Sequence, residues 1–225
     1  MSDRSRYTAF FILLLFLCVY YWLAVESSWR WWLLWPALSC TVQALAYGLN
    51  RPYLVCGKTS SGRISLPMVL LNLPWLTFTW TTWGLIVLFS REPSINPIPG
   101  TNVSISRYPL FGVDLAGFDR VLDLTAEFPC LYRVQKQYRC LPSLDGIALS
   151  NLLAVLDIKP AEKVLIHCAQ GHGRSATFAS LLLTGYSIFS TAEGAYVAIL
   201  NVRPGAKLAK SQKLQLQAGS LTHRT

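Results

Sequence analysis

Two patterns of apolar and polar positions divide the chain, and the change between them comes near Arg91. Before it, three long uncharged stretches are separated only by short polar breaks. They cover Tyr7–Val25, Trp31–Asn50 and Ile64–Ser90. A helix needs about 20 mainly apolar residues to cross a bilayer core of about 30 Å. The pattern therefore predicts an all-α transmembrane anchor of two to three helices over residues 1–90.

The first and third stretches each allow a second interpretation. Tyr7–Val25 could be a signal peptide, but no small-x-small cleavage site follows and a second apolar run comes at once, so we expect a retained helix. Ile64–Ser90 is less regular because it contains Pro67 and Pro74. We favour a third span there over a re-entrant or interfacial segment. In the second stretch, Pro36 suggests a kink near the start.

After Ser90 the pattern becomes that of a globular domain. Residues 91–100 hold three prolines and a glycine and predict a linker. Residues 101–225 alternate short apolar runs with helical periods, which predicts an α/β domain with a central sheet flanked by helices. The strands are expected at Val103–Ser106, Arg120–Leu124, Gln137–Leu141 and Lys163–His167, and the helices at Ala148–Ile158, Arg174–Thr184, Thr191–Asn201 and Ser211–Ala218.

Composition supports a membrane protein and argues against a nucleic-acid partner. Charged residues make up 14% of the chain, where a soluble domain has about 25%. The net charge of +9 comes from scattered residues that form no basic run and no nucleic-acid motif. Lys and Arg beside apolar spans are typical of membrane topology and anionic lipid. The lipid bilayer is therefore the partner that the charge predicts.

Six cysteines and three histidines give no sign of a metal site. Cys18 and Cys40 lie in apolar runs, where cysteine acts as a small hydrophobic residue. No C-x-x-C spacing is present, and no histidine has metal-ligand spacing, so neither a metal nor a cofactor is expected. Cys130 and Cys140 could pair in an oxidising compartment, which their spacing alone does not decide.

Cys168 begins a segment of a different kind. The strand Lys163–His167 runs directly into Cys168–Ser175 (CAQGHGRS), and the apolar helical segment Ala176–Leu183 follows. A strand, a glycine-bearing loop and a helix in this order aim backbone N–H groups at an anion. Gly171 and Gly173 allow the loop to curl around a phosphate.

The side chains of this loop have separate chemical uses. The Arg174 guanidinium can bind two phosphate oxygens. Cys168 lies in the same positive field, which favours the nucleophilic thiolate. Ser175 can donate a hydrogen bond that helps the sulfur to leave. We expect phosphate to bind mainly through the backbone of the positions between Cys168 and Arg174, which are Ala169, Gln170, Gly171, His172 and Gly173.

The segment from His167 to Ser175 resembles the signature of the protein-tyrosine phosphatase superfamily, His-Cys-x5-Arg-Ser/Thr, at every fixed position. The resemblance extends over about Pro97–Gly219. Four segments are similar to the dual-specificity branch and especially to its bacterial membrane-linked members: Val121–Pro129, Tyr138–Gly146, Arg203–Gly205 and Gln212. It implies a dual-specificity-phosphatase-like fold and a cysteine-dependent phosphatase without a cofactor.

The same resemblance makes Asp145 the general acid, which protonates the leaving oxygen. The interval from Asp145 to Cys168 is shorter than the branch usually has, so Asp157 stays as a weaker rival. Asp123 and Glu127 lie in a strand-to-loop turn and are expected to be structural. His167 is expected to order the loop by hydrogen bonding.

The loop carries no lysine at its variable positions, which favours a single phosphate monoester over a multiply phosphorylated ring. A phosphoprotein and a phospholipid head group both remain open as substrates, as does the oligomeric state. Two other classes stay as alternatives. One is a phosphate-binding module without turnover, and the other is a membrane scaffold with a vestigial phosphatase domain.

The predicted location is a multi-pass position in a bacterial inner membrane. With three spans, the distribution of basic residues places the N-terminus in the cytoplasm and the catalytic domain outside it. If Ile64–Ser90 only dips into the bilayer, the domain returns to the cytoplasm, where a thiolate is more easily kept reduced.

Overall fold

The computed structural model of the chain describes residues 1–110, 113–130, 137–150 and 158–222. Two compact units make up the chain. The first contains the N-terminal helices and consists of Met1–Thr59, Arg63–Ser90 and Ala126–Pro129. The second contains the sheet and consists of Ser60–Gly62, Arg91–Thr125 and Cys130–Thr225.

The first unit is helical. Its elements are α1 (Asp3–Ala24), the 3-10 helix η1 (Ser28–Leu33), α2 (Leu34–Leu49), α3 (Tyr53–Cys56) and α4 (Leu66–Phe89). Among the described residues, α1 alone is both long and apolar enough to cross a membrane. The helix α2 has 16 residues, and α4 has 24 residues whose Asn, Thr, Trp and Pro content lowers its mean hydropathy.

The second predicted helix begins three residues later in the structure than in the prediction. Trp31–Leu33 belong to η1, so α2 begins at Leu34 and not at Trp31. Pro36 therefore lies in the first turn of α2, where a missing N–H breaks no helical hydrogen bond. Pro36 therefore gives no reason to expect a kink in α2.

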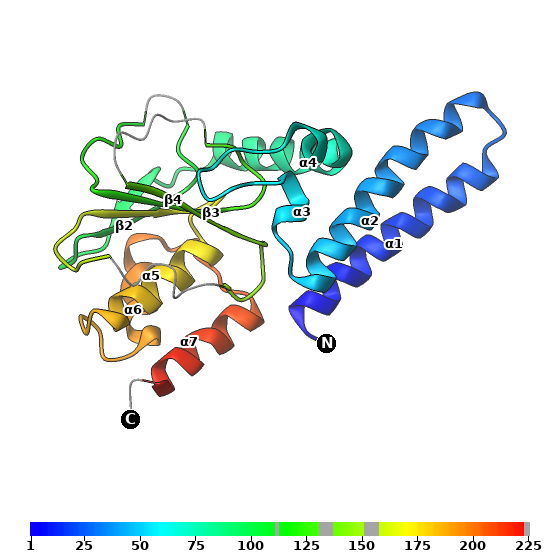
Figure 1. The fold of residues 1–225 in the computed structure, drawn as a ribbon. Helices are drawn as coiled ribbons and strands as arrows, with labels where there is room; N and C mark the ends of the chain where they lie inside the picture. The colour runs from blue at the N-terminus through cyan, green and yellow to red at the C-terminus, as the bar shows by residue number, and fades with distance from the viewer. Residues whose placement is uncertain (111–112, 131–136, 151–157, 223–225) are drawn as a thin grey trace. The chain divides into compact units, whose positions relative to one another are not determined.

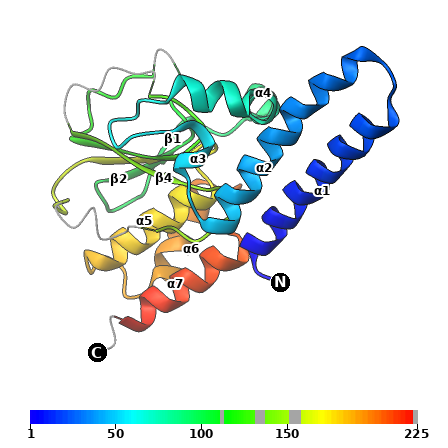
Figure 2. The same ribbon diagram turned by 45° about the vertical axis from the view of Figure 1, so that its right-hand side comes forward.

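A buried polar pair joins α2 to α4. Gln43 Nε2 donates to Asn72 Oδ1 at 2.9 Å, and Asn72 Nδ2 donates to the carbonyls of Leu54 and Met68 at 3.0 and 3.1 Å. The helix α1 packs against the same two helices, because Phe11 of α1 contacts Tyr47 of α2 and Trp75 of α4. Figure 2 shows α1 and α2 running side by side.

In the part of the chain that the structure describes, the second unit is built on a five-stranded sheet in the order β1-β2-β5-β3-β4. Its strands are β1 (Ile95–Pro97), β2 (Val103–Ser106), β3 (Arg120–Thr125), β4 (Gln137–Ser143) and β5 (Val164–His167). Only β1 is antiparallel to its neighbour. The other four strands are parallel, so their carboxyl ends meet at one edge of the sheet, which is where open α/β sheets bind ligands.

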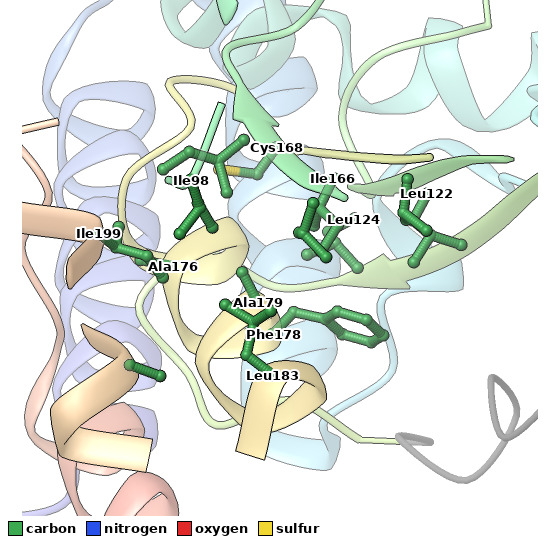
Figure 3. Packing of buried hydrophobic residues seen from close by; sticks show 14 of the residues in the cluster. Ile98, Leu122, Leu124, Ile166, Cys168, Ala176, Phe178, Ala179, Leu183 and Ile199 are labelled. Atoms are coloured by element: carbon green, nitrogen blue, oxygen red, sulfur yellow. The ribbon is translucent and has the colours of Figure 1, made fainter. Parts of the chain in front are cut away.

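Alternation along the strands determines what covers each face. Leu122, Leu124 and Ile166 point to the face covered by α5 (Gly173–Gly185), α6 (Ala192–Val202) and α7 (Lys210–Thr222) (Figure 1). Val121 and Leu165 point to the opposite face, where they pack with Leu115. Figure 3 shows the larger cluster between the sheet and α5, with Cys168 among its members.

The four predicted strands coincide with β2–β5 to within two residues at each end. Two predicted helices match α5 and α6 to within one residue at each end, and the predicted helix Ser211–Ala218 lies within α7, which continues to Thr222. The fourth, Ala148–Ile158, falls largely on residues 151–157, which lie outside the described residues. The segment predicted as a linker is part of the domain: it forms the edge strand β1, and Ile98 is buried in the core.

Candidate active site

The loop between β5 and α5 is held against its neighbours through two glycines. Gly171 has a φ of +70°, and a Cβ there would lie 2.5 Å from the carbonyl of Ser106, at the end of β2. A side chain is therefore excluded both by conformation and by space. Gly173 has no positive φ, but a Cβ there would lie 2.9 Å from Gln212 Oε1 on α7. The loop therefore approaches Ser106 closely because position 171 lacks a side chain, and the glycine at position 173 leaves room for the Gln212 side chain.

Cys168 and Ser175 lie inside the domain at either end of this loop. Cys168 is 3% exposed and belongs to the apolar cluster of Figure 3. Ser175 is fully buried, and its Oγ has no hydrogen-bond partner within the described part of the chain. A buried hydroxyl that is not engaged elsewhere can donate to a nearby charged sulfur.

Arg174 is fixed by the ends of two strands. Its guanidinium is buried, and Nη1 donates to the carbonyl of Ser143 at 2.9 Å and to that of Leu124 at 3.3 Å. Its Nε lies 3.3 Å from Asp145 Oδ1. The arginine thus connects the loop to β3 and β4 and brings the Asp145 carboxylate to the site.

Asp145 reaches this position because β4 ends at Ser143, and only β3 lies between β4 and β5. Its side chain is 68% exposed while that of Arg174 is 1% exposed. Water screens a carboxylate this exposed, so its ion pair with Arg174 contributes little to stability. The rival, Asp157, lies outside the described residues.

Asp123 is fully buried on β3, where it makes structural contacts. It accepts hydrogen bonds from Thr125 N at 2.8 Å, Thr125 Oγ1 at 2.7 Å and Tyr138 Oη at 2.7 Å. Its Oδ2 lies 3.9 Å from Nε2 of His167, which is also fully buried. Glu127 accepts from the backbone N–H of Ala126 at 2.9 Å. These contacts fit the structural roles expected for both acids.

The structure also brings to the loop two charged residues whose place the sequence did not indicate. Glu92, from the predicted linker, accepts a hydrogen bond from His172 Nε2 at 2.7 Å. Arg203 donates from Nη2 to the carbonyl of Gln170 at 2.7 Å. Burial alone raises the pKa of Glu92, but the His172 hydrogen bond, together with Arg203 and the Gly205 N–H, outweighs it and lowers that pKa below its usual value.

In the sequence, only the resemblance indicates Arg203, and nothing indicates Glu92. Glu92 and His172 are 80 positions apart, so no local spacing could have indicated their contact. Within the described ranges, no three His, Cys, Asp or Glu side chains gather in a way that could hold a metal ion.

No protein-family model matches the sequence, and no curated protein matches it. Solved structures do match. A mutant form of Tk-PTP is 28% identical with a TM-score of 0.50, and the alignment covers 59% of this chain and 97% of that one. A mouse putative dual specificity phosphatase complexed with zinc tungstate is 18% identical with a TM-score of 0.51, over 60% of this chain and 92% of that one. The second unit thus has the dual-specificity phosphatase fold of the protein-tyrosine phosphatase superfamily.

Proposed function

We propose that the second unit is a cysteine-dependent phosphatase that hydrolyses phosphate monoesters. The observation that carries this proposal is the convergence of Cys168, Arg174 and Asp145 at one edge of the sheet, with the Asp145 carboxylate 3.3 Å from the arginine that follows the cysteine loop. A module that only binds phosphate needs the loop and the arginine. It does not need a carboxyl group beside them, whereas an alkoxide leaving group needs a proton donor there.

In the first step, the loop N–H groups and the Arg174 guanidinium bind the phosphate oxygens and stabilise the charge that builds up on them. The Cys168 thiolate attacks phosphorus in line with the leaving oxygen. The S–P bond forms as the P–O bond breaks, and Asp145 gives its proton to the leaving oxygen. The products are an alcohol or phenol and a cysteinyl-phosphate.

In the second step, the Asp145 carboxylate takes a proton from water as the water oxygen attacks phosphorus. The S–P bond breaks, and the electron pair returns to sulfur. The uncommitted hydroxyl of Ser175 donates a hydrogen bond to the thiolate as it leaves. Inorganic phosphate departs, and Asp145 is again protonated for the next cycle.

The proposed substrate is a single phosphate monoester on a phosphoprotein or on a phospholipid head group. The loop positions around the anion carry no lysine that could bind a second phosphate. Cys168 is almost completely buried, so only the small phosphoryl group can reach it, while the rest of the substrate stays at the mouth beside Asp145.

We further propose that the first unit is a three-span anchor made of α1, η1 with α2, and α4. At about 2.0 Å per 3-10 residue and 1.5 Å per α-helical residue, η1 and α2 together extend over about 36 Å, enough to span. The helix α4 has no charged residue and exposes large apolar side chains such as Phe78 and Leu88. The Gln43–Asn72 hydrogen bond is of the kind that joins helices inside a bilayer.

Replacing Cys168 by serine should abolish turnover and preserve phosphate binding. The hydroxyl is a far weaker nucleophile than a thiolate, while the loop N–H groups and Arg174 are unchanged. Turnover of p-nitrophenyl phosphate and calorimetric binding of inorganic phosphate measure the two effects. Cys130→Ser is the matched control and should retain activity. Activity of purified Cys168→Ser equal to that of the unaltered chain would contradict the mechanism.

Asp145→Asn should slow the hydrolysis of alkyl phosphates far more than that of activated aryl phosphates. General-acid assistance contributes on the order of 10²- to 10⁴-fold for a poor leaving group. The measurement is kcat/KM across phosphate esters whose leaving groups differ in acidity, with Asp157→Asn alongside. If Asp157→Asn shows this dependence and Asp145→Asn does not, the acid is Asp157.

Reporter fusions should find the two ends of α4 on opposite sides of the membrane. In the three-span arrangement, a reporter fused after Asn50 is cytoplasmic, and reporters fused after Ser90 and Thr225 are on the outer side, because basic residues favour the cytoplasmic side. Cytoplasmic signals at all three positions would replace this arrangement with a two-helix anchor and a cytoplasmic phosphatase.

A further inference from the structure

We infer that Glu92 is a positioning residue for the phosphate loop, which it holds in its anion-binding shape through His172 and Arg203. The inference rests on the proposed function, since it assigns a role at the same site. Glu92 lies in the segment that joins α4 to β1, which the sequence presents as a linker. It does not touch the reacting atoms and acts through the two residues that it holds.

The Glu92 carboxylate is bound on both oxygens. Oε2 accepts a hydrogen bond from His172 Nε2 at 2.7 Å and lies 3.4 Å from Arg203 Nη2. Oε1 accepts from the backbone N–H of Gly205 at 3.1 Å. One carboxylate therefore joins a side chain of the loop to the segment that follows α6.

Arg203 connects Glu92 to the loop backbone. It is 1% exposed, its Nη2 donates to the carbonyl of Gln170, and its Nη1 donates to the carbonyl of Pro93 and to Asn96 Oδ1. Burial lowers the pKa of Arg203, whereas the charges of Glu92 and Cys168 act to raise it. Removing Glu92 would leave a buried guanidinium with less compensating charge, which is costly.

The carbonyl that Arg203 binds determines where an N–H points. In a planar trans peptide the C=O and the following N–H point in opposite directions. With the Gln170 carbonyl held by Arg203, the N–H of Gly171 faces the other way. The preceding carbonyl, that of Ala169, accepts from the N–H of Tyr108 at 3.0 Å. Donors outside the loop thus hold two consecutive carbonyls, which orients the following N–H groups for the anion.

The space around Glu92 fits this role. A Cβ on Gly205 would overlap Glu92 Oε1 and would lie 3.1 Å from His172 Nε2. The Glu92–His172 pair therefore occupies the volume that a side chain at position 205 would need. The side chains of Glu92 and His172 are each about one-quarter exposed, so their hydrogen bond is partly shielded from water.

The test compares Glu92→Ala and Glu92→Gln with Glu193→Gln, a matched change on an exposed acid of α6. The full-length chain in detergent is used throughout. Binding of inorganic phosphate is measured by calorimetry with Cys168→Ser also present, and kcat and KM are measured with p-nitrophenyl phosphate in the active chain. Thermal unfolding reports whether each variant is folded.

Glu92→Ala should weaken phosphate binding and lower kcat/KM by on the order of 10- to 100-fold, the cost of a small misplacement of binding groups. Glu92→Gln keeps an acceptor for the Gly205 N–H and should recover part of this loss. Glu193→Gln should change neither quantity. Glu92→Ala should also lower the unfolding temperature, because it leaves the buried Arg203 guanidinium with less compensating charge. Phosphate binding is therefore compared at a temperature at which every variant is folded, which separates positioning from a general loss of stability.

Phosphate affinity equal to that of the parent chain in both folded Glu92 variants would overturn the inference. Loss of folding in both would overturn it as well, because Glu92 would then be a stability residue. An unaltered chain that binds phosphate but has no turnover would contradict the proposed function, while the calorimetric comparison would still test Glu92 directly.

Discussion

The proposed phosphate site depends on one constraint: the backbone between Cys168 and Arg174 must keep its N–H groups turned toward a single anion. A free peptide would not hold this shape, because several N–H dipoles pointing at one place repel each other. The fold maintains it with contacts outside the loop. Gly171 lies directly against the Ser106 carbonyl, Tyr108 and Arg203 hold the outward carbonyls, and Gly173 leaves room for Gln212. The parallel sheet places Ser106 and Tyr108 beside the start of the loop, while Arg203 comes from the end of α6 and Gln212 from α7.

The proposed catalytic groups differ in burial according to the role of each. The groups proposed to bind and attack phosphate, Arg174 and Cys168, are almost completely buried, so their positions are fixed by packing and cost little reorganisation during the reaction. The proposed acid, Asp145, is largely exposed at the mouth, where leaving groups of different shape can approach it. This division fits the proposed function, because a buried anion site can bind the phosphoryl group while the group that carries it stays outside, beside Asp145.

The sequence was sufficient wherever a feature is local. Short apolar runs predicted four of the five strands, and the run from His167 to Ser175 indicated the loop together with its glycines, cysteine and arginine. Features that depend on distant partners were not predictable in this way. The strand β1 forms because Ile95–Pro97 finds β2, although its prolines suggest a linker. The contact between Glu92 and His172 joins residues far apart in sequence. The start of α2 at Leu34 depends on the 3-10 turn before it, which has the same apolar pattern as a helix.

The central claim is that phosphate passes through a covalent bond to the sulfur of Cys168. The most direct measurement is rapid acid quenching of the full-length chain during turnover of p-nitrophenyl phosphate, followed by mass spectrometry of its peptides. The mechanism predicts one added phosphoryl group on the peptide that contains Cys168, more of it in Asp145→Asn with this activated ester because water attack is slowed, and none in Cys168→Ser. Turnover with no phosphoryl group on Cys168 under any quench condition, or with the group on another residue, would contradict the account.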